Sequence, residues 1–335
     1  MKHILVTGGS GYVGSHVAKL LHEHGYIPVV FDLLAGHKEW ASPHWPAVAG
    51  DINNTKDLIK IFNIYEFDAV IHLAASSEVG ASVTDPLRYY KNNVAGTANI
   101  LQFCAQMSIS KIVFSSTSSV YGEIDPKNLP TKEWYSKNPA TSYGASKLAV
   151  EYMLRDIEVS NGVRSVSLRY FNASGASPDS KIGEFRPKPS HLIPSIQAVV
   201  EGRRPEFVIN GDDYPTPDGT TVRDYTHIWD IAQAHLHALK YLDQGGNTDC
   251  FNIGAGKGKS VLEMFTEFQK QLGREIPMTV GARRPGDIPI NYADTTKAQE
   301  ILGWKPVVSD TESIVRDAIR WYSSDLYKTI SHYRD

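Results

Sequence analysis

A glycine-rich turn near the start of the chain constrains the fold more than any other feature. Ile4-Leu5-Val6-Thr7 reads as a short buried strand, and the amphipathic helix that comes after the turn ends at Gly25. Between them stand Gly8, Gly11 and Gly14, at G-x-x-G-x-x-G spacing. Glycine allows a tight turn, close approach of the backbone to a pyrophosphate and packing of helix on strand, and the helix N-terminus supplies amides and a dipole for that charge. The unit predicts a dinucleotide site beside the first strand.

Strands and helices alternate through the first half of the chain. Apolar runs predict strands, and helical periodicity fills the segments between them. The expected strands are 28–31, 48–52, 69–75, 111–114 and 163–168, and the expected helices are about 55–65, 86–107 and 142–161. The alternation predicts an α/β fold with a doubly wound, Rossmann-like parallel sheet, in which ligands bind at the carboxyl ends of the strands.

The second half is less regular and predicts a smaller α/β substrate-binding C-terminal lobe. After Asn172, Pro- and Gly-rich segments replace the regular alternation. We expect helices from His191 and over 225–241, a strand at 208–210, and a strand at 250–253 that returns to the sheet. Residues 254–260 resemble a P-loop but are one residue short between the outer glycines, which favours a cap for a helix over 261–272.

Acidic residues follow the second and third predicted strands. Asp32 stands at the tip of the second strand, where a carboxylate accepts hydrogen bonds from a ribose 2′-hydroxyl and repels a 2′-phosphate. No arginine follows it closely, so the sequence favours NAD over NADP. A capping aspartate is the alternative. Asp51, at the end of the third strand, is placed to meet the adenine.

Tyr143 and Lys147 stand four residues apart on a predicted helix that Thr141 or Ser142 can cap and Gly162 ends. At this spacing the two side chains lie on one face, one turn apart. A lysine ammonium near a phenol favours the phenolate, which makes Tyr143 a candidate base nearer neutral pH. The alternative is a tyrosine and a lysine on a solvated helix face.

Composition argues against several classes of function. The formal net charge of -3 over 335 residues gives no electrostatic footprint for nucleic acid or an anionic membrane. Cys104 and Cys250 form neither a disulfide framework nor a zinc pattern, so we expect a cytoplasmic protein. No His-Glu-x-x-His, signal peptide or apolar run of membrane-spanning length is visible. We therefore expect no metal site and no nucleic-acid or membrane partner.

Longer motifs occur in order over nearly the whole chain. They are Thr7-Gly8-Gly9-Ser10-Gly11-Tyr12-Val13-Gly14-Ser15-His16, Tyr89-Tyr90-x-Asn92-Asn93-Val94, Arg169-Tyr170-Phe171-Asn172, Asp213-Tyr214-Pro215-Thr216-x-Asp218-Gly219-Thr220, Val222-Arg223-Asp224-Tyr225 and Arg283-Arg284-x-Gly286-Asp287. With Tyr143-x-x-x-Lys147 and a serine/threonine cluster before it, the chain resembles the extended short-chain dehydrogenase/reductase family. Within that family it resembles the UDP-glucose 4-epimerases.

The resemblance implies an isomerase with tightly bound NAD, which interconverts UDP-glucose and UDP-galactose through a transient 4-keto sugar. By position, Tyr143 is the base that takes the C4 hydroxyl proton. Lys147 holds the nicotinamide ribose and lowers the pKa of the tyrosine. Thr117 matches the family's catalytic hydroxyl, usually a serine, and keeps its donor and acceptor.

The resemblance also implies contacts with the cofactor. These fall at Gly8, Gly11, Tyr12, Val13, Gly14, Asp32, Asp51, Ile52, Leu73, Ala74, Ala75, Asn92, Thr117, Tyr143, Lys147 and Phe171. Two positions depart from the family. Ser77 stands where the family carries a lysine, which removes a possible contact with a cofactor phosphate. Leu33 follows Asp32 where an asparagine is usual.

Contacts with a UDP-sugar are implied in the same way. They fall at Thr117, Tyr143, Asn172, His191, Leu192, Val208, Asn210, Arg223, Arg284, Asp287 and Asn291. Arg223 and Arg284 form the expected diphosphate clamp, because guanidinium offers phosphate a bidentate fork. Asp287 would take a ribose hydroxyl.

Three substrate positions carry unusual residues for the family. His191 replaces an asparagine, and Asn210 replaces a common phenylalanine in the strand that pairs with uracil through its backbone. Asn291 is smaller than the tyrosine of enzymes restricted to glucose and galactose. It suggests the hypothesis that UDP-GlcNAc or UDP-GalNAc is also accepted. The alternative is that a second residue closes the pocket.

The resemblance further implies how the chain is organised. It implies an NAD-binding domain of residues 1–174 plus about 224–256, and a UDP-sugar-binding lobe of about 175–223 plus 257–335. It also implies a homodimer through the helices at 86–107 and 142–161, which would form a four-helix bundle of two chains.

The sequence gives less support to two other functions. A nucleotide-sugar dehydratase on this scaffold needs an acid beside the catalytic hydroxyl, typically in Thr-Asp-Glu, where Ser118 and Ser119 stand here. A non-catalytic dinucleotide-sensing regulator need not keep Thr117, Tyr143 and Lys147 together. The sequence therefore favours the epimerase.

Overall fold

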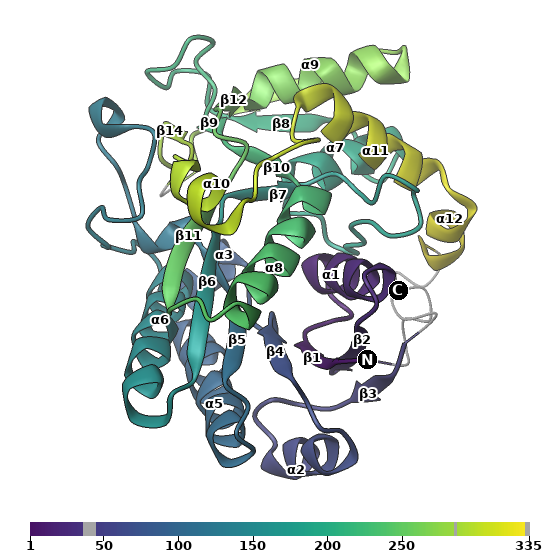
Figure 1. The fold of residues 1–335 in the computed structure, drawn as a ribbon. Helices are drawn as coiled ribbons and strands as arrows, with labels where there is room; N and C mark the ends of the chain where they lie inside the picture. The colour runs from purple at the N-terminus through teal and green to yellow at the C-terminus, as the bar shows by residue number, and fades with distance from the viewer. Residues whose placement is uncertain (36–44, 285–286, 332–335) are drawn as a thin grey trace.

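A parallel sheet forms the centre of the protein, seen in a computed structural model that describes residues 1–35, 45–284 and 287–331. Figure 1 shows the sheet with helices on both faces. Its seven strands lie in the order β11 (Asp249–Ile253), β6 (Arg164–Tyr170), β5 (Lys111–Thr117), β4 (Ala69–His72), β1 (His3–Thr7), β2 (Ile27–Asp32) and β3 (Ala47–Ala49). This confirms the predicted doubly wound, Rossmann-like sheet, including the return of the strand at 250–253, which pairs with β6.

Each face of the sheet is covered by its own helices. The flanking helices are α1 (Tyr12–Glu23) and α8 (Ile228–Asp243) on one face, and α2 (Thr55–Ile64), α5 (Gly96–Gln106) and α6 (Ser142–Asn161) on the other. In β1, Ile4 and Val6 pack with α1 and α8, whereas Leu5 packs on the opposite side. The alternation of a strand therefore supplies both cores, because successive side chains point to opposite faces.

The helix predicted at 86–107 consists of three consecutive segments. They are α4 (Pro86–Tyr89), the π-helical segment η2 (Tyr90–Ala95) and α5. A further short helix, α3 (Val79–Thr84), was not predicted. Single-turn π segments are frequent at functional sites, and η2 carries Asn92 and Asn93.

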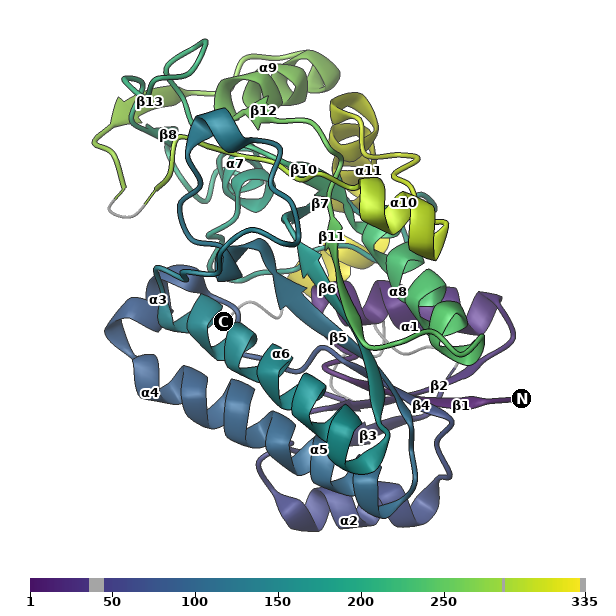
Figure 2. The ribbon, with the colours of Figure 1, turned by 60° about the vertical axis from the view of Figure 1, so that its left-hand side comes forward.

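Smaller sheets and further helices stand at one end of the central sheet, as Figures 1 and 2 show. The paired strands are β7 (Asn172–Ser174) with β10 (Tyr225–His227), β8 (Phe207–Asn210) with β13 (Met278–Gly281), and β9 (Val222–Arg223) with β12 (Lys259–Ser260) and β14 (Ile290–Asn291). The helices are α7 (Leu192–Val200), α9 (Val261–Leu272), α10 (Thr296–Leu302), α11 (Thr311–Ser323) and α12 (Asp325–Ser331). The helices α7, α9, α11 and α12 share a separate core around Phe268 and Trp321 with the strands β8 and β10.

Two local predictions in this half have different outcomes. The helix expected over 225–241 is wrong at its start, because Tyr225–His227 form β10 and the helix begins at Ile228. The cap expected before 261–272 is confirmed. Ser260 accepts a hydrogen bond from Glu263 N, and the Glu263 side chain accepts one from Ser260 N, which is a capping box rather than a phosphate loop.

The strand order places a switch point beside β1. The chain runs from β1 outward to β2 and β3 on one side, and later to β4, β5 and β6 on the other. Ligands of such sheets bind outside the carboxyl ends of the strands at this point. Among the described residues, no helix combines the length and apolar character that crossing a membrane requires.

Candidate active site

The glycine turn packs tightly between β1, β4 and α1. Gly8 has a φ of +71°, and a Cβ there would lie 2.6 Å from Ala74 N. A Cβ on Gly14 would lie 2.2 Å from Gly8 O. Only glycine fits at these two positions, so the turn brings bare backbone to the end of β1.

The first turn of α1 has amides that no side chain caps. Gly11 is the N-cap residue of α1 and has no side chain to accept their hydrogen bonds, and Tyr12 and Val13 follow it. The first N–H groups of a helix lack partners within the helix and carry partial positive charge. This arrangement fits the diphosphate of a dinucleotide.

Asp32 ends β2 beside the turn and its carboxylate is fixed by backbone. Its Oδ2 accepts a hydrogen bond from Ser10 N at 3.1 Å, and its Oδ1 accepts one from Leu34 N at 2.9 Å. Asp32 therefore caps the turn, as in the alternative considered above. Each oxygen keeps a further lone pair, so the same carboxylate fits a ribose 2′-hydroxyl and disfavours a 2′-phosphate.

A polar network connects the ends of β3 and β4 with η2. Asp51 accepts hydrogen bonds from the backbone and side-chain nitrogens of Asn53, at 2.8 and 3.0 Å. Asn53 Nδ2 donates to Asn92 Oδ1 at 3.0 Å, and Asn92 Nδ2 donates to Ser76 Oγ at 3.3 Å. The structure thus brings together Asp51 and Asn92, two predicted cofactor contacts that lie on separate elements.

Small or apolar predicted contacts occupy the remaining strand ends. Leu73, Ala74 and Ala75 follow β4, and Leu73 N donates to Thr7 O at 3.0 Å. Ile52 is buried after β3. Phe171 is buried after β6, where its N–H donates to Ile253 O at 3.2 Å. All the predicted cofactor residues therefore lie at or just beyond the carboxyl ends of strands, or on the helices that follow.

The three candidate catalytic side chains come from β5 and α6. Thr117 is the last residue of β5 and hydrogen-bonds with Tyr143, which lies in the first turn of α6. Thr141 caps that helix by accepting from Gly144 N at 3.3 Å, and Gly162 ends it, as predicted. Lys147 is 2% exposed, and its Nζ donates to Ser115 O at 2.7 Å.

Burial dominates the acid–base properties of this group. It raises the pKa of Tyr143 to about 12, and the hydrogen bond with Thr117 offsets this in part. It lowers the pKa of Lys147 to about 7, because a buried ammonium loses its hydration. Lys147 is not among the groups that shift the Tyr143 pKa in the chain alone, so a lowering of that pKa by Lys147 stays a prediction for the NAD-bound protein.

The predicted diphosphate clamp is held by one carboxylate. Arg284 donates to Asp287 from Nε and Nη2, at 3.1 and 3.0 Å, and Arg223 Nη2 lies 3.5 Å from Asp287 Oδ1. Arg223 is largely buried and Arg284 largely exposed. Asp287, expected to take a ribose hydroxyl, thus brings both arginines together. Pro285 and Gly286 of this motif lie outside the described residues.

The other predicted substrate residues lie on β14, β8, β7 and the start of α7. Asn291 pairs in register with Arg223 in the β9–β14 ladder, and its Oδ1 accepts from Thr131 Oγ1 at 3.4 Å. Val208 and Asn210 are both exposed on one face of β8. His191 is the N-cap residue of α7, directly before the half-buried Leu192, and Asn172 is exposed at the start of β7.

Comparisons with known proteins decide the family. The model of the NAD dependent epimerase/dehydratase family matches residues 4–254. The chain belongs to this family. It is 44% identical to a UDP-glucose 4-epimerase of Lacticaseibacillus casei over 322 residues, which covers 96% of this chain and 97% of that protein.

Solved structures of epimerases agree with the family assignment. The UDP-glucose 4-epimerase from Brucella ovis, in complex with NAD, is 43% identical, with a TM-score of 0.91 over 95% of this chain and 97% of that chain. The UDP-Glc/GlcNAc 4-epimerase from Campylobacter jejuni is 35% identical, with a TM-score of 0.82 over 96% and 99%. NAD is therefore the cofactor of this epimerase/dehydratase family member, and the glycine turn, the free first-turn amides and Asp32 fit it.

Two residues close to the predicted contacts, Thr131 and Arg186, were not predicted from the sequence. Thr131 contacts Asn291 but lies in a loop without a motif. Arg186 lines a cavity beside the predicted cofactor contacts although it lies far along the chain. A charged residue in a proline-rich run gives no periodic or motif signal, so only the fold reveals its place.

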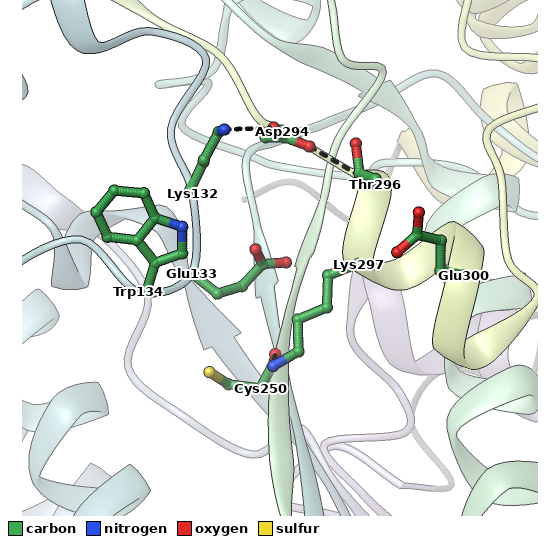
Figure 3. A pocket seen from close by; sticks show the side chains of 8 residues that line it. All are labelled: Lys132, Glu133, Trp134, Cys250, Asp294, Thr296, Lys297 and Glu300. Carbon is green, nitrogen blue, oxygen red and sulfur yellow. Dashed lines mark hydrogen bonds and ion pairs between the residues drawn. The ribbon is translucent and has the colours of Figure 1, made fainter.

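A different cavity lies at the edge of the sheet, against β11. This edge-strand cavity of about 600 Å³ is lined by Lys132, Glu133, Trp134, Cys250, Asp294, Thr296, Lys297 and Glu300. Figure 3 shows Lys297 extending from α10 toward Cys250, opposite Trp134. Lys297 Nζ donates to Cys250 O at 3.0 Å, and Glu133 Oε1 accepts from Asn252 N at 2.8 Å.

The charged side chains of the edge-strand cavity have a structural task. Because β11 is an edge strand, its outer backbone groups lack a neighbouring strand. Glu133 and Lys297 satisfy an amide and a carbonyl there. Among the described residues, no group of three or more His, Cys, Asp or Glu side chains is arranged to hold a metal ion.

Proposed function

We propose that the protein is an NAD-dependent 4-epimerase that interconverts UDP-glucose and UDP-galactose. The observation that carries the proposal is the convergence of Thr117, Tyr143 and Lys147 at the end of β5 and the start of α6, at the same sheet end as the glycine turn. The relatives named as UDP-glucose 4-epimerases, matched over nearly the full chain, support it.

The chain's own residues move the proton of the reaction. Tyr143 takes the proton of the sugar C4 hydroxyl as C4 is oxidised to the ketone, and returns it when the other face is reduced. Thr117 hydrogen-bonds the phenol and orients it. Bound NAD⁺ would accept the hydride that leaves the sugar C4, and its positive charge would favour the phenolate. Lys147 holds the nicotinamide ribose.

The nucleotide is held at the other end of the site. Arg223 and Arg284 bind the diphosphate once the anion draws them from Asp287, with which both arginines pair. Val208 and Asn210, exposed on β8, offer their strand to uracil, and His191 and Leu192 approach from α7. Asn172, at the start of β7, completes the sugar pocket.

A product analysis separates this proposal from its rivals. The protein is incubated with UDP-galactose and the nucleotide sugars are resolved by chromatography and mass. A 4-epimerase yields UDP-glucose of unchanged mass, whereas a dehydratase yields a product that has lost one water. A dinucleotide-sensing regulator yields neither.

Asn291 supports acceptance of N-acetylated sugars. Its half-buried side chain contacts Thr131 and leaves more room than a tyrosine would. The relative from Campylobacter jejuni is named for both UDP-Glc and UDP-GlcNAc. We expect turnover of UDP-GlcNAc by the native chain, and a loss of at least about tenfold in Asn291→Tyr with UDP-galactose turnover retained. Absence of UDP-GlcNAc turnover by the native chain would show that another residue closes the pocket, and equal turnover in both proteins would show that residue 291 does not limit the substrate.

A homodimer completes the proposal. Large apolar side chains are exposed on the two helices expected to meet a partner, with Leu87 and Tyr90 on one and Tyr152 and Val159 on the other. Exposed apolar side chains on both of these helices support an interface there. Light scattering should report a dimer at micromolar concentration in the native protein. A monomer there would contradict the assembly.

The domain organisation and the cellular location are part of the same proposal. We place the NAD-binding domain at residues 1–174 plus about 224–256, and the UDP-sugar lobe at about 175–223 plus 257–335. The separate core around Phe268 and Trp321 supports this division. Cys104 and Cys250 are both free thiols, which fits a cytoplasmic protein.

A further inference from the structure

An arginine from a distant part of the chain reaches the predicted cofactor site. A cavity of about 600 Å³ lies beside the ends of β2 and β4, and Ala75 and Asn92, two predicted NAD contacts, line it. Ser77, which stands where the family carries a lysine, lines it as well. The arginine is Arg186, in the segment between β7 and α7. We call this space the cofactor-side cavity.

The guanidinium of Arg186 is fixed at one end and open at the other. Its Nε donates to Glu184 Oε1 at 2.5 Å, and Glu184 is buried. Its Nη1 lies 3.7 Å from Glu78 Oε1, beyond hydrogen-bond distance. Within the described residues, the two terminal nitrogens have no hydrogen-bond partner, although they are the fork that suits a phosphate.

The charge of Arg186 acts on the first residue of α1. Burial raises the pKa of Tyr12 well above its ordinary value, Glu184 raises it further, and Arg186 opposes both. The Tyr12 phenol donates to Gly175 O at 2.6 Å, so Arg186 acts on the tip of a side chain whose backbone begins α1.

Other cations of the cofactor-side cavity are less suited to this task. Arg88 and Lys91 also line it, but both are exposed, and solvent screens an exposed charge. Only about a fifth of the Arg186 side chain is exposed, and a buried carboxylate holds it in place. A fixed, half-buried guanidinium loses less entropy on binding an anion than a free side chain does.

We propose that Arg186 binds the diphosphate of NAD and supplies the positive charge that Ser77 cannot. The inference rests on the proposed function, because it takes the dinucleotide as the resident cofactor. Glu184 also accepts a hydrogen bond from His191 Nδ1 at 2.8 Å. One carboxylate thus positions both a cofactor ligand and a predicted contact of the sugar nucleotide.

The test measures how fast the cofactor leaves. The protein is loaded with NADH, excess NAD⁺ is added, and the fall in bound NADH fluorescence gives the release rate. Arg186→Gln should release NADH about tenfold to a hundredfold faster, the range expected for one charge-assisted hydrogen bond. Arg186→Lys keeps the charge without the fork and should show a smaller increase, which also serves if the glutamine variant does not fold.

A matched control variant and a rescue variant distinguish a charge that acts on the cofactor from a structural role of Arg186. Arg203 pairs through Nε with Glu201 at 2.6 Å, two residues away, as Arg186 does with Glu184, but it does not line the cavity. Arg203→Gln should release NADH at the native rate. Adding Ser77→Lys to Arg186→Gln should restore release to within about threefold of native, because it returns a cation to the same cavity.

The outcomes distinguish this inference from the proposed function. A native protein that binds no dinucleotide would remove the proposed function itself. A native protein that holds NADH, with Arg186→Gln and Arg186→Lys releasing it at the native rate, would overturn the role of Arg186 alone. A raised KM for UDP-galactose with unchanged NADH release would place Arg186 on the diphosphate of the substrate and equally overturn it.

Discussion

Two lysines of this protein have nearly the same local geometry and opposite surroundings. Lys147 Nζ donates to a strand carbonyl, that of Ser115, at 2.7 Å and lies 4.7 Å from the centre of the Phe114 ring. Lys297 Nζ donates to the carbonyl of Cys250 at 3.0 Å and lies 4.8 Å from the centre of the Phe251 ring.

The counter-charge is what differs. Lys297 pairs with Asp249 Oδ1 at 2.5 Å and is about a third exposed. Among the described residues, no carboxylate pairs with Lys147, which is almost fully buried. A buried cation without a counter-ion costs stability, so its presence on α6 beside β5 points to a task other than folding. Cavity volume does not separate the two regions, because the cofactor-side cavity and the edge-strand cavity are both about 600 Å³.

The largest expected effect is on turnover, and it should distinguish Tyr143 in the active site from Tyr135 near the edge-strand cavity. Tyr143→Phe removes the proposed base and should lower turnover of UDP-galactose about a thousandfold, within the range of general acid–base catalysis. Bound NAD and the unfolding temperature should stay near native. Tyr135→Phe, which loses only a hydrogen bond to Asn128 O near the edge-strand cavity, should turn over at the native rate. Near-native turnover by Tyr143→Phe would show that another group is the base.

The second prediction concerns the free energy of unfolding, which should rise when Lys147 is replaced and fall when Lys297 is replaced. Lys147→Met removes an uncompensated buried charge at the cost of one hydrogen bond, and should stabilise the NAD-free protein at pH 7 by on the order of 3 to 4 kcal/mol, while turnover is lost. Chemical denaturation of the NAD-free protein measures this change. A large destabilisation would show that Lys147 is a structural residue.

The pH dependence of that change follows from the pKa of Lys147. The folded pKa of about 7 lies below the ordinary value of 10.5, so between these values the unfolded state binds one proton more. Stability of the NAD-free protein should therefore rise with pH through this window, by up to about 1.4 kcal/mol per pH unit from this group. The advantage of Lys147→Met should be full at pH 7 and vanish by about pH 10.5. An advantage independent of pH would contradict the lowered pKa.

The smallest expected effect is at the edge strand. Lys297→Met breaks a partly exposed ion pair and a hydrogen bond to Cys250 O, which should cost about 1 kcal/mol of unfolding free energy. Bound NAD and turnover per folded molecule should not change. Reduced NAD content in this variant would connect the edge-strand cavity with the active site and break the comparison.

The part of the site carried by regular elements could be predicted from the sequence. Gly8 and Gly14 occupy positions that only glycine fits, and Thr141 caps the helix that places Tyr143, because these features depend on residues close in the chain. Local signals of this kind also predicted the parallel, doubly wound sheet, through the alternation of strands and helices.

The rest depends on contacts that local patterns do not encode. Arg186 reaches the cofactor-side cavity from an irregular segment, and its position is set by Glu184 rather than by periodicity. The tyrosine pKa is another example. Spacing alone predicted that Lys147 would lower it, whereas burial raises it in the chain alone. Burial is a property of the whole packed structure, so its effect could not be read from two residues.

The central claim is that Tyr143 and Lys147 work beside a dinucleotide that the protein retains. The most direct measurement is to incubate the purified protein with UDP-galactose, without added NAD, and to follow UDP-glucose over time. The account predicts that UDP-glucose forms over many turnovers and that the denatured protein releases NAD. Absence of product, from a protein that also fails to retain NAD when it is supplied, would contradict it.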